Sequence, residues 1–361
     1  MTRTLSYAGL LELTEAILMR GFGYSEEEAR ITAKVLVEAD ARGIPSHGVS
    51  RLEFYQRNLK GGFVTLGAIP EIVHQTPTSL LVDGCGGVGC YVAEWSIRKL
   101  IEKAKTSGAV FCAVRNSNHY GIAGLWAEEI AANDMIGLAF TNTYPCAIPT
   151  YCRQRLLGSN PVAVAIPEKD GRFFVLDMAT TTVAHGKIEL YDRRKEPMPI
   201  GWVVDENGRN TTDATAFEKH FLSDPLYGGH LFLGGEGELC GGHKGFGLGL
   251  LVELLCSGLS SGLSSFETYR DKGAGIAHFF GAIRLDIFGN ADELKRHIGA
   301  ILNTIRTSEK AEGEERIWIH GEKEAETRAH SMAQGVPIDE ATWSFLETLA
   351  KDIKIPFPTA S

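Results

Sequence analysis

The glycine cluster Gly84-Cys85-Gly86-Gly87-Val88-Gly89 constrains the fold more than any other feature, because it lies between an expected strand and an expected helix. It fits the G-x-G-x-x-G pattern of dinucleotide-binding folds. In those folds the next strand ends near an acidic residue that binds the ribose hydroxyls. Here the apolar run 109–114 leads into Arg115 and Asn116 instead. Because a chain with 41 glycines produces such patterns by chance, we expect a tight strand-to-helix turn rather than a standard Rossmann site.

Charge and cysteine content exclude several classes of protein. The formal net charge is -9 and no basic cluster stands out, so nucleic acid is not expected as a partner. Seven cysteines without a Cys-x-x-Cys pair fit reduced thiols in the cytoplasm. The N-terminus lacks the apolar core of a signal peptide. The most apolar segment, 246–259, contains Glu253 and is too short to span a bilayer, so we expect a buried helix there and no membrane partner.

The remaining periodicities predict a mixed α/β fold. Ser25 and Glu28 form a capping-box signature at the start of a helix within the largely helical first fifty residues. Beyond residue 62, short apolar runs alternate with helical patterns, and the clearest strand is 79–83. The end of the chain returns to helix around 338–351.

One histidine follows the expected strand 109–114 directly, in the polar run Arg115-Asn116-Ser117-Asn118-His119-Tyr120-Gly121. A strand exit rich in side-chain amides can hold an imidazole at the edge of a cleft, where it can exchange protons near neutral pH. The segment is equally compatible with a buried histidine whose nitrogens are satisfied by those amides.

A second histidine lies in Ser46-His47-Gly48, shortly before Arg51. Ser46 can bond a substrate oxygen, His47 can transfer a proton, and Arg51 can bind a carboxylate through two parallel hydrogen bonds. A capping serine, a surface histidine and a solvated arginine would produce the same residues.

Two further motifs suit a cofactor. Asp177 precedes Met178, Ala179 and Thr180 after an apolar run, and can bind ribose or cap a helix. In Gly241-Gly242-His243-Lys244-Gly245, glycines and a lysine open an apolar helix, a place that attracts a pyrophosphate. Close helix packing with an exposed lysine is the alternative for this segment.

Together these motifs resemble the malate/L-lactate dehydrogenase family, which also holds ureidoglycolate, sulfolactate and diketogulonate oxidoreductases. The matching motifs occur in the family's order over nearly the whole chain. They are Ser46-His47-Gly48 with Arg51, 116–121, 158–161, 177–180, Gly201-Trp202 with Asp205, Lys244-Gly245-Phe246-Gly247 and His320-Gly321-Glu322.

The resemblance implies an NAD- or NADP-dependent oxidoreductase with a non-Rossmann cofactor domain built on a largely antiparallel mixed sheet. It also implies a helical substrate and dimerisation domain, 1–75 with 325–361, beside a mixed α/β region, 76–324, whose cofactor domain covers about 118–300. The expected assembly is a homodimer with the active site near the subunit contact.

For individual residues, the resemblance implies catalysis by His47, His119 and Ser46, with the histidine that carries the proton left open. Substrate contacts are expected from Arg51, Asn118 and Tyr120. The expected cofactor contacts are Thr143, Asp177, Met178, Ala179, Thr180, His243, Lys244, His320, Gly321 and Glu322. Where some members carry a lysine before the Gly-Ser-Asn-Pro motif, this chain has Arg153 and Arg155.

The expected reaction is hydride transfer between a nicotinamide and a small 2-hydroxy acid, with malate favoured because Arg153 and Arg155 can meet a second carboxylate. Lactate, ureidoglycolate, sulfolactate and a cyclic imino acid are the alternatives. A different kind of function is also possible: a catalytically inactive binding protein with the same fold. A further alternative is a zinc hydrolase that uses His47, His119 and Asp177, although no metal is expected.

Overall fold

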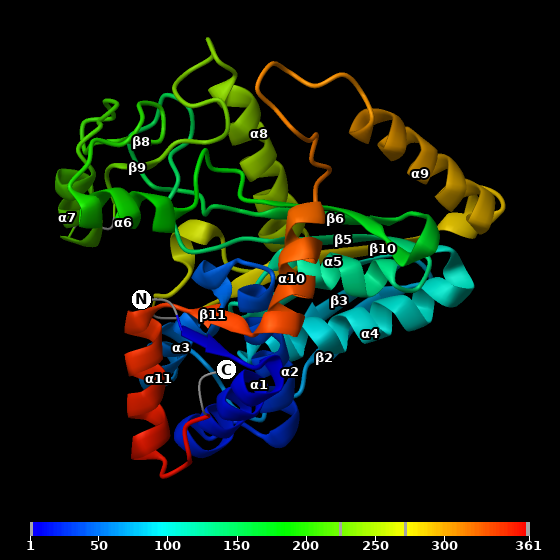
Figure 1. The fold of residues 1–361 in the computed structure, drawn as a ribbon, viewed down its shortest axis with the longest axis horizontal. Helices are drawn as coiled ribbons and strands as arrows, with labels where there is room; N and C mark the ends of the chain where they lie inside the picture. Colours follow the sequence, from blue (N-terminus) through cyan, green and yellow to red (C-terminus); the bar gives the residue numbers. More distant parts are fainter. Residues whose placement is uncertain (1–2, 224–225, 271–272, 359–361) are drawn as a thin grey trace.

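A seven-stranded sheet forms the centre of the molecule in the computed structural model, which describes residues 3–223, 226–270 and 273–358 (Figure 1). The strands in chain order are β1 (Arg3–Leu5), β2 (Glu71–Thr76), β3 (Ser79–Asp83), β4 (Ala109–Ser117), β5 (Met135–Thr141), β6 (Val162–Pro167), β7 (Phe173–Met178), β8 (Val203–Val204), β9 (Gly229–His230), β10 (Ile276–Arg284) and β11 (Val336–Ile338).

Helices surround this sheet on both sides. The α-helices are α1 (Tyr7–Ala16), α2 (Glu26–Ala41), α3 (Leu52–Lys60), α4 (Gly89–Ser107), α5 (Ala123–Ala131), α6 (His185–Arg194), α7 (Ala214–Ser223), α8 (Gly242–Glu253), α9 (Ala291–Arg306), α10 (Glu322–Gln334) and α11 (Glu340–Asp352). The short 3-10 and π helices are η1 (Ile17–Gly21), η2 (Pro45–His47), η3 (Val49–Arg51), η4 (Lys169–Gly171), η5 (Leu254–Gly258), η6 (Ser265–Glu267) and η7 (Leu285–Ile287).

The strand order of the main sheet is β2-β3-β4-β10-β5-β6-β7. Within the described residues only β3 and β4 run parallel, and every other neighbouring pair runs antiparallel. This arrangement confirms the predicted non-Rossmann, largely antiparallel mixed sheet. The parallel pair needs a crossover, which α4 supplies.

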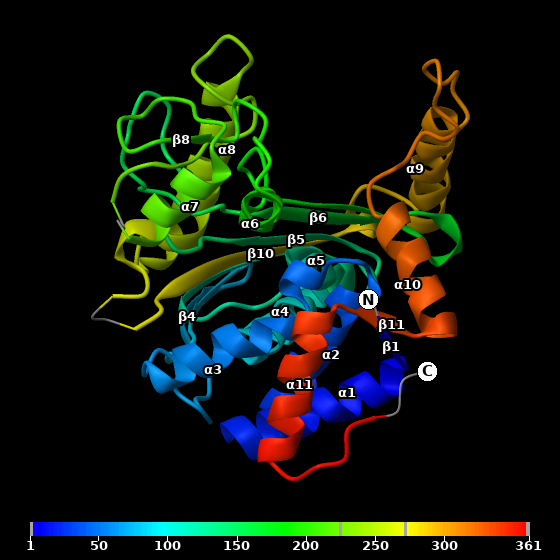
Figure 2. The same cartoon turned by 60° about the vertical axis from the view of Figure 1, so that its left-hand side comes forward.

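One face of the sheet is covered by α4 and α5 (Figure 2). Val110, Cys112 and Val114 alternate along β4 and enter the same buried cluster as Trp126 and Ile130 of α5. The strand expected from the apolar run 109–114 is confirmed, and its alternate side chains fill this core.

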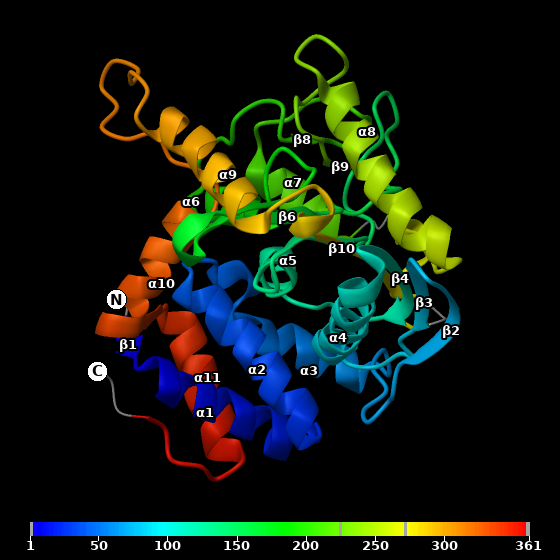
Figure 3. The same ribbon diagram turned by 90° about the vertical axis from the view of Figure 1, so that its right-hand side faces the viewer.

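The two ends of the chain meet in a helical layer. β1 pairs antiparallel with β11, and α1, α2 and α11 enclose a second buried cluster (Figure 3). α2 contributes to both clusters: Ile31 and Val35 face the sheet-side core, while Leu36 and Val37 face the helical layer. Its predicted capping box is confirmed, because Ser25 and Glu28 bond each other's backbone and side chain reciprocally.

The glycine cluster is the expected tight turn between β3 and α4. Gly84 N donates to Arg115 O and Gly86 N to Asn116 O, so these backbone donors are held by the end of β4. A Cβ at Gly89 would lie 2.2 Å from Asn118 O, which excludes any side chain at that position. The cluster lets two strand ends approach each other, and this close packing explains a glycine pattern without a phosphate site.

The expectation of a buried helix at 246–259 is wrong in one respect. Val252 and Cys256 pack against Phe279 of β10, but Leu251 and Leu254 are 50% and 57% exposed. The helical segment lies on the sheet face opposite α4 and α5, so only one side of it meets the core (Figure 1). Composition alone could not reveal this, because an apolar helix can face either a core or a partner.

Candidate active site

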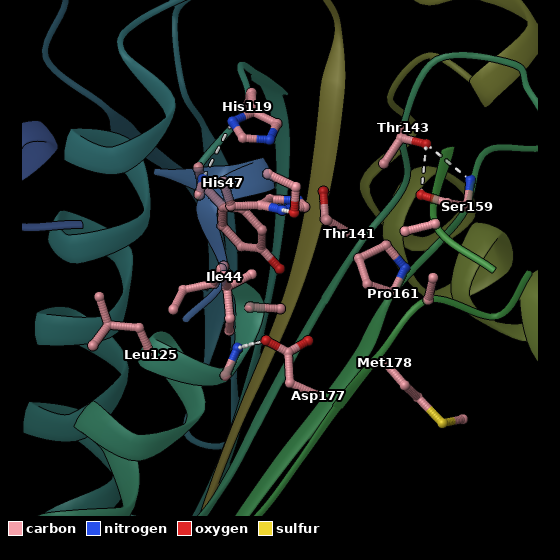
Figure 4. Close-up of a pocket in the computed structure, with 18 of the residues that line it drawn as sticks. Ile44, His47, His119, Leu125, Thr141, Thr143, Ser159, Pro161, Asp177 and Met178 are labelled. Carbon is pink, nitrogen blue, oxygen red and sulfur yellow. Dashed lines mark hydrogen bonds between the residues drawn. The ribbon is translucent and has the colours of Figure 1, made fainter. Parts of the chain in front are cut away.

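A cavity of about 630 Å³ opens between the segment after α2, the end of β4 and the ends of β5, β6 and β7 (Figure 4). It falls in the size range typical of small-molecule and cofactor sites. Sequence-predicted residues that line it are Ser46, His47, Arg51, His119, Tyr120, Thr143, Asp177, Met178, Ala179, His320 and Gly321. Residues far apart in the chain thus meet at one pocket.

The loop with His47 is anchored at both ends. Asp40 of α2 accepts a hydrogen bond from Val49 N at 2.7 Å. The Ser46 hydroxyl lies 3.0 Å from His47 Nδ1, and Arg51 Nε donates to Ser46 O. The loop therefore holds the serine, the histidine and the arginine in one small rigid group at the mouth of the cavity.

Gly48→Ala is expected to displace this loop. A Cβ at position 48 would lie 1.9 Å from Oδ1 of Asp40, whose carboxylate is buried and bonded to Val49 N. Overpacking of this kind costs about 1–3 kcal/mol. Because a displacement of about 1 Å at a catalytic group can cost roughly 100-fold in rate, we expect both a lower Tm and a kcat lower by at least about 10-fold.

Thermal unfolding and steady-state kinetics measure the two effects. Gly299→Ala is the matched control, because a Cβ there meets its neighbour, Glu168 Oε2, at an ordinary 3.5 Å. A Gly48→Ala protein with normal kcat would show that the loop tolerates the change.

His119 lies just beyond the end of β4, beside His47. The two rings stack with centroids 5.7 Å apart. The Tyr55 hydroxyl and Gly121 N approach His119 Nδ1 at 2.9 and 3.3 Å. Phe54 contacts the same ring edge-on. Both histidines are thus oriented by neighbours rather than by solvent.

Burial controls the charge of both imidazoles. It lowers the pKa of His47 to about 4, with a further lowering from the Arg51 charge. Burial and the nearby charges of His47 and Arg51 lower the pKa of His119 well below its usual value. At neutral pH both rings are therefore uncharged, and each can hold a hydrogen bond or accept a proton from a bound group.

Asp177 marks the opposite wall of the cavity. Its Oδ2 accepts a hydrogen bond of 2.7 Å from Gly124 N, and its other oxygen turns toward the open space (Figure 4). Burial raises the pKa of this carboxyl to about 6. Nearby, Thr143 Oγ1 accepts from Ser159 N at 3.0 Å. A carboxylate oxygen that faces the open space suits the hydroxyl groups of a ribose.

Other predicted residues lie outside the cavity lining. Asn118, expected on the substrate, instead donates to Gly86 O and Gly87 O in the glycine turn. The Thr180 hydroxyl donates to Ser159 O and Asn160 O, so it fixes the wall instead of facing a ligand.

Three expected cofactor residues are also placed elsewhere. The Glu322 carboxylate pairs with Arg306 and Arg316, so it joins α9 to α10. His243 and Lys244 lie exposed at the N-terminus of α8, away from the cavity of their own chain.

Several residues of the pocket were not among the predicted site residues. Asn142, Tyr144, Ser159, His185, His230, Tyr269 and Trp318 also line the cavity. His185 Nδ1 lies 3.0 Å from His230 Nε2 although 45 positions separate them in the chain. Only Ser159 belongs to a motif that could have revealed it, the Gly-Ser-Asn-Pro stretch.

A buried carboxylate supports the cavity wall from behind. Glu253 accepts hydrogen bonds from Asn160 Nδ2 at 2.9 Å, from Asn142 Nδ2 at 3.4 Å and from Ser265 N at 2.7 Å. Asn142 lines the cavity and Asn160 follows the lining residue Ser159. The buried charge is thus compensated by several donors, as a stable interior carboxylate requires.

Two neutral imidazoles, a serine and an arginine converge on one cavity, an arrangement suited to proton transfer on a small anionic ligand. Within the described residues no group of three or more histidine, cysteine or acidic side chains is arranged to hold a metal ion. In the same part of the chain, no helix is long and apolar enough to cross a membrane.

Known proteins agree with this interpretation. A family model described as malate/L-lactate dehydrogenase matches residues 5–347. The chain is 40% identical to malate dehydrogenase of Pyrococcus abyssi over 336 residues, which cover 92% of this chain and 90% of that protein. It is 36% identical to L-sulfolactate dehydrogenase of Methanocaldococcus jannaschii over 341 residues, 93% of each chain.

Solved structures give the same result. Malate dehydrogenase from Entamoeba histolytica superposes with a TM-score of 0.94 at 30% identity, over 99% of this chain and all of the other. Malate dehydrogenase from Pyrococcus horikoshii gives 0.89 at 37% identity, over 99% and 97%. The chain belongs to the malate/L-lactate dehydrogenase family. It is therefore a dehydrogenase that acts on hydroxy acids, and the family implies a nicotinamide cofactor.

Proposed function

We propose that this dehydrogenase oxidises malate to oxaloacetate and catalyses the reverse reduction. The observation that carries the proposal is the group of Arg51, Ser46 and His47 at one end of the cavity. Arg51 binds the carboxylate next to the reacting carbon, and Ser46 bonds the hydroxyl oxygen. His47 Nε2 receives the hydroxyl proton in oxidation and returns it in reduction. A nicotinamide held in the same cavity would supply the hydride chemistry at the substrate carbon.

The preference for malate rests on the relatives named malate dehydrogenase. We predicted from the sequence that Arg153 and Arg155 bind the second carboxylate of malate. Their positions in the structure do not support this prediction. Arg155 is buried and donates to Phe221 O and Tyr227 O, and neither arginine lines the cavity. Lactate, ureidoglycolate, sulfolactate and a cyclic imino acid stay as alternatives. Relatives at 31 to 36% identity include a sulfolactate dehydrogenase and a pyrroline-2-carboxylate reductase.

One assay tests substrate and cofactor together. NADH and NADPH are each mixed with the enzyme and a panel of 2-oxo acids, and the loss of reduced-nicotinamide absorbance is followed. We expect the highest kcat/KM for oxaloacetate. A higher value for pyruvate, sulfopyruvate or a cyclic imine acid would replace malate as the substrate.

The cavity fits a nicotinamide cofactor in its donor set. Asp177 can accept ribose hydroxyls, and Thr143 with the backbone near Met178 and Ala179 can face the same sugar. His320 and Gly321 line the far end, beside Trp318. Both cationic and acidic side chains lie at this end, including Arg42, Lys323 and Glu324, so NAD and NADP are both retained as candidates.

Asp177→Asn is expected to weaken cofactor binding and to stabilise the free protein at alkaline pH. A hydrogen bond to a charged acceptor contributes about 1.5–3 kcal/mol, so we expect Kd for the cofactor to rise roughly 10- to 100-fold. Because burial raises the pKa of Asp177 to about 6, the folded protein binds this proton more tightly than the unfolded chain does. The carboxyl therefore favours folding in acid, and this contribution disappears as pH rises through 6.

Fluorescence titration with reduced cofactor measures Kd, and thermal unfolding at pH 4 and pH 8 measures stability. The variant should unfold at a higher temperature than the parent at pH 8, with the difference shrinking toward pH 4. An unchanged Kd would remove Asp177 from the cofactor site.

We also propose that the protein is a homodimer that uses the exposed side of α8 and η5. Leu248, Leu251 and Leu254 follow one another at three-residue intervals and are 40 to 57% exposed. Phe111, 39% exposed, continues this apolar surface across the sheet, because it stacks on Phe279 beneath η5. Exposed apolar side chains in a row are typical of subunit contacts.

The proposed contact lies in the mixed α/β region, whereas the family resemblance implies dimerisation through the helical domain 1–75 with 325–361. Lys244 is on the same helix and outside its own cavity, so a dimer through α8 offers Lys244 to the partner's site. Light scattering tests the mass in solution, and Leu251→Glu should shift it toward the monomer. A parent protein of monomeric mass would reject the dimer.

A cytoplasmic location is our remaining proposal. Its support is that the seven cysteines are all free thiols. Cell fractionation would test it.

A further inference from the structure

His119 has hydrogen-bond partners that decide which of its ring nitrogens carries the proton. Gly121 N–H is a permanent donor, and it points at His119 Nδ1 from 3.3 Å. Nδ1 must therefore offer its lone pair, which leaves the hydrogen of the neutral ring on Nε2. The Tyr55 hydroxyl, 2.9 Å from the same Nδ1, completes this arrangement as a second donor.

We infer that Gly121 and Tyr55 lock His119 in the Nε2–H form, so that His119 is a fixed hydrogen-bond donor to the reacting substrate oxygen and not the carrier of the transferred proton. This inference rests on the proposed function, which assigns the transferred proton to His47 and gives His119 no role. Tyr55 becomes a positioning residue, since it acts only through the imidazole.

The opposite tautomer has no good arrangement of partners. A hydrogen on Nδ1 would face the Gly121 N–H directly, and two donors would be forced together. Tyr55 would then have to accept the bond, and its own hydrogen would be left with Cys90 Sγ, which is 4.0 Å away. Tyr55 is buried among the helical-layer side chains, so losing that bond has a real cost.

His47 has the partner that a proton carrier needs. Its Nδ1 faces the Ser46 hydroxyl at 3.0 Å, and a hydroxyl can accept as well as donate. With Nδ1–H bonded to Ser46, the lone pair of Nε2 is available to receive the substrate proton. In oxidation the O–H bond of the substrate breaks and a new N–H bond forms on His47, while the hydride passes to the nicotinamide. His119 gains and loses no bond.

Electrostatics support this division of roles. The two rings are 5.7 Å apart and lie near the Arg51 guanidinium, so two imidazolium ions could not coexist there. When His47 takes the proton, His119 must stay neutral. A neutral ring with a fixed N–H can still stabilise the negative charge that builds on the substrate oxygen. Figure 4 shows His47 and His119 on the same side of the cavity. The Nε2 atom of His119 lies on the opposite side of the ring from Nδ1, which carries the dashed hydrogen bond.

Nitrogen NMR of the cofactor-free protein tests the tautomer directly. The protein is labelled with ¹⁵N-histidine, and the His119 signals are those absent from His119→Gln. We expect one protonated nitrogen, Nε2, and one unprotonated nitrogen, Nδ1, at every pH from 7 to 9. A signal for Nδ1–H, or for a doubly protonated ring in this range, would overturn the inference.

Kinetics of two variants test the role. Glutamine at 119 offers an amide donor near the position of Nε2 but cannot carry a proton, whereas alanine offers nothing. We expect His119→Ala to lose roughly 100- to 1,000-fold in kcat, as for the loss of an oxyanion donor, and His119→Gln to recover at least about 10-fold of it. The pH dependence of kcat should be the same in His119→Gln and the parent. Equal rates in both variants, with the pH-dependent limb lost, would make His119 the proton carrier.

Tyr55→Phe tests the positioning. Loss of one hydrogen bond of ordinary strength should lower kcat by about 3- to 10-fold and leave the cofactor Kd unchanged. Tyr91→Phe is the matched control, since both tyrosines lie outside the cavity lining but the hydroxyl bonded to His119 belongs to Tyr55. In Tyr55→Phe, a His119 NMR pattern that broadens or mixes tautomers supports the lock, and an unchanged pattern with unchanged kcat contradicts the role of Tyr55.

The NMR result does not depend on the reaction. A locked Nε2–H ring in a protein that reduces no 2-oxo acid would leave the tautomer standing and reject the proposed function. An active enzyme with a mobile proton on His119 would reject only this inference.

Discussion

Replacement of His47 by alanine is expected to lower kcat for malate oxidation by roughly 100- to 10,000-fold, the usual contribution of a general acid–base group. The cause is the loss of an imidazole whose Nδ1 faces the Ser46 hydroxyl and whose Nε2 can then accept a proton. The fold should survive, because His47 lies in a short 3-10 turn at the cavity rim. Stopped-flow kinetics and circular dichroism measure the two effects.

The pH dependence of the parent enzyme follows from the same residue. Burial and the Arg51 charge lower the pKa of His47 to about 4. In the free enzyme, oxidation needs the neutral ring, so kcat/KM for malate should rise with pH through 4 and then level. Reduction needs the charged ring, so kcat/KM for oxaloacetate should fall as pH rises above 4.

The stability of the folded protein should also depend on pH through His47. The folded state binds the His47 proton less tightly than the unfolded chain, whose histidines titrate near pH ~6.5. This group therefore favours folding above pH ~6.5, and that contribution is lost as pH falls toward 4. In His47→Gln the decline of Tm between pH 6.5 and 4 should be smaller than in the parent. A His47→Ala protein with near-normal kcat would remove His47 from the mechanism.

Local pattern was sufficient to predict much of the architecture. The apolar run 109–114 and the capping pair Ser25 and Glu28 both produce the expected elements, since each depends on neighbours in the chain. The loop Ser46-His47-Gly48 and the segment ending at His119 also meet in one cavity, as the family motifs indicated.

Side-chain direction could not be predicted in the same way. Whether the Asn118 amide faces a substrate or the glycine turn depends on the pairing of β3 with β4. The Glu322 carboxylate does not face the cavity, because it forms ion pairs with Arg306 and Arg316, which lie outside its own helix. Tyr55 belongs to no recognised sequence motif. The role we propose for it comes from its contact with His119, which is 64 positions further along the chain. Such contacts form between segments far apart in the chain, so the local hydrophobic pattern of the sequence cannot predict them.

Arg51→Lys is expected to raise KM for malate roughly 10- to 100-fold, the effect of losing one strong hydrogen bond to a charged group. Arg51 Nε is bonded to Ser46 O, so its two terminal nitrogens are the ones that can bind a carboxylate in parallel. Lysine offers a single point of charge, and it loses the tether to Ser46 as well. Initial rates against malate concentration measure KM. Arg57→Lys is the matched control, because Arg57 faces the same Phe54 ring at 5.7 Å but lies outside the cavity lining.

A second substitution separates the geometry of Arg51 from its charge. Lysine keeps the positive charge beside His47, so the acid limb of the pH profile should stay near 4 while KM rises. In Arg51→Gln the charge disappears, and the limb should move upward. It should not reach the ~6.5 of a free imidazole, because burial is the larger cause of the lowered pKa. An unchanged KM in Arg51→Lys would reject the carboxylate site. A limb that stays at 4 in Arg51→Gln would show that burial alone determines the charge of His47.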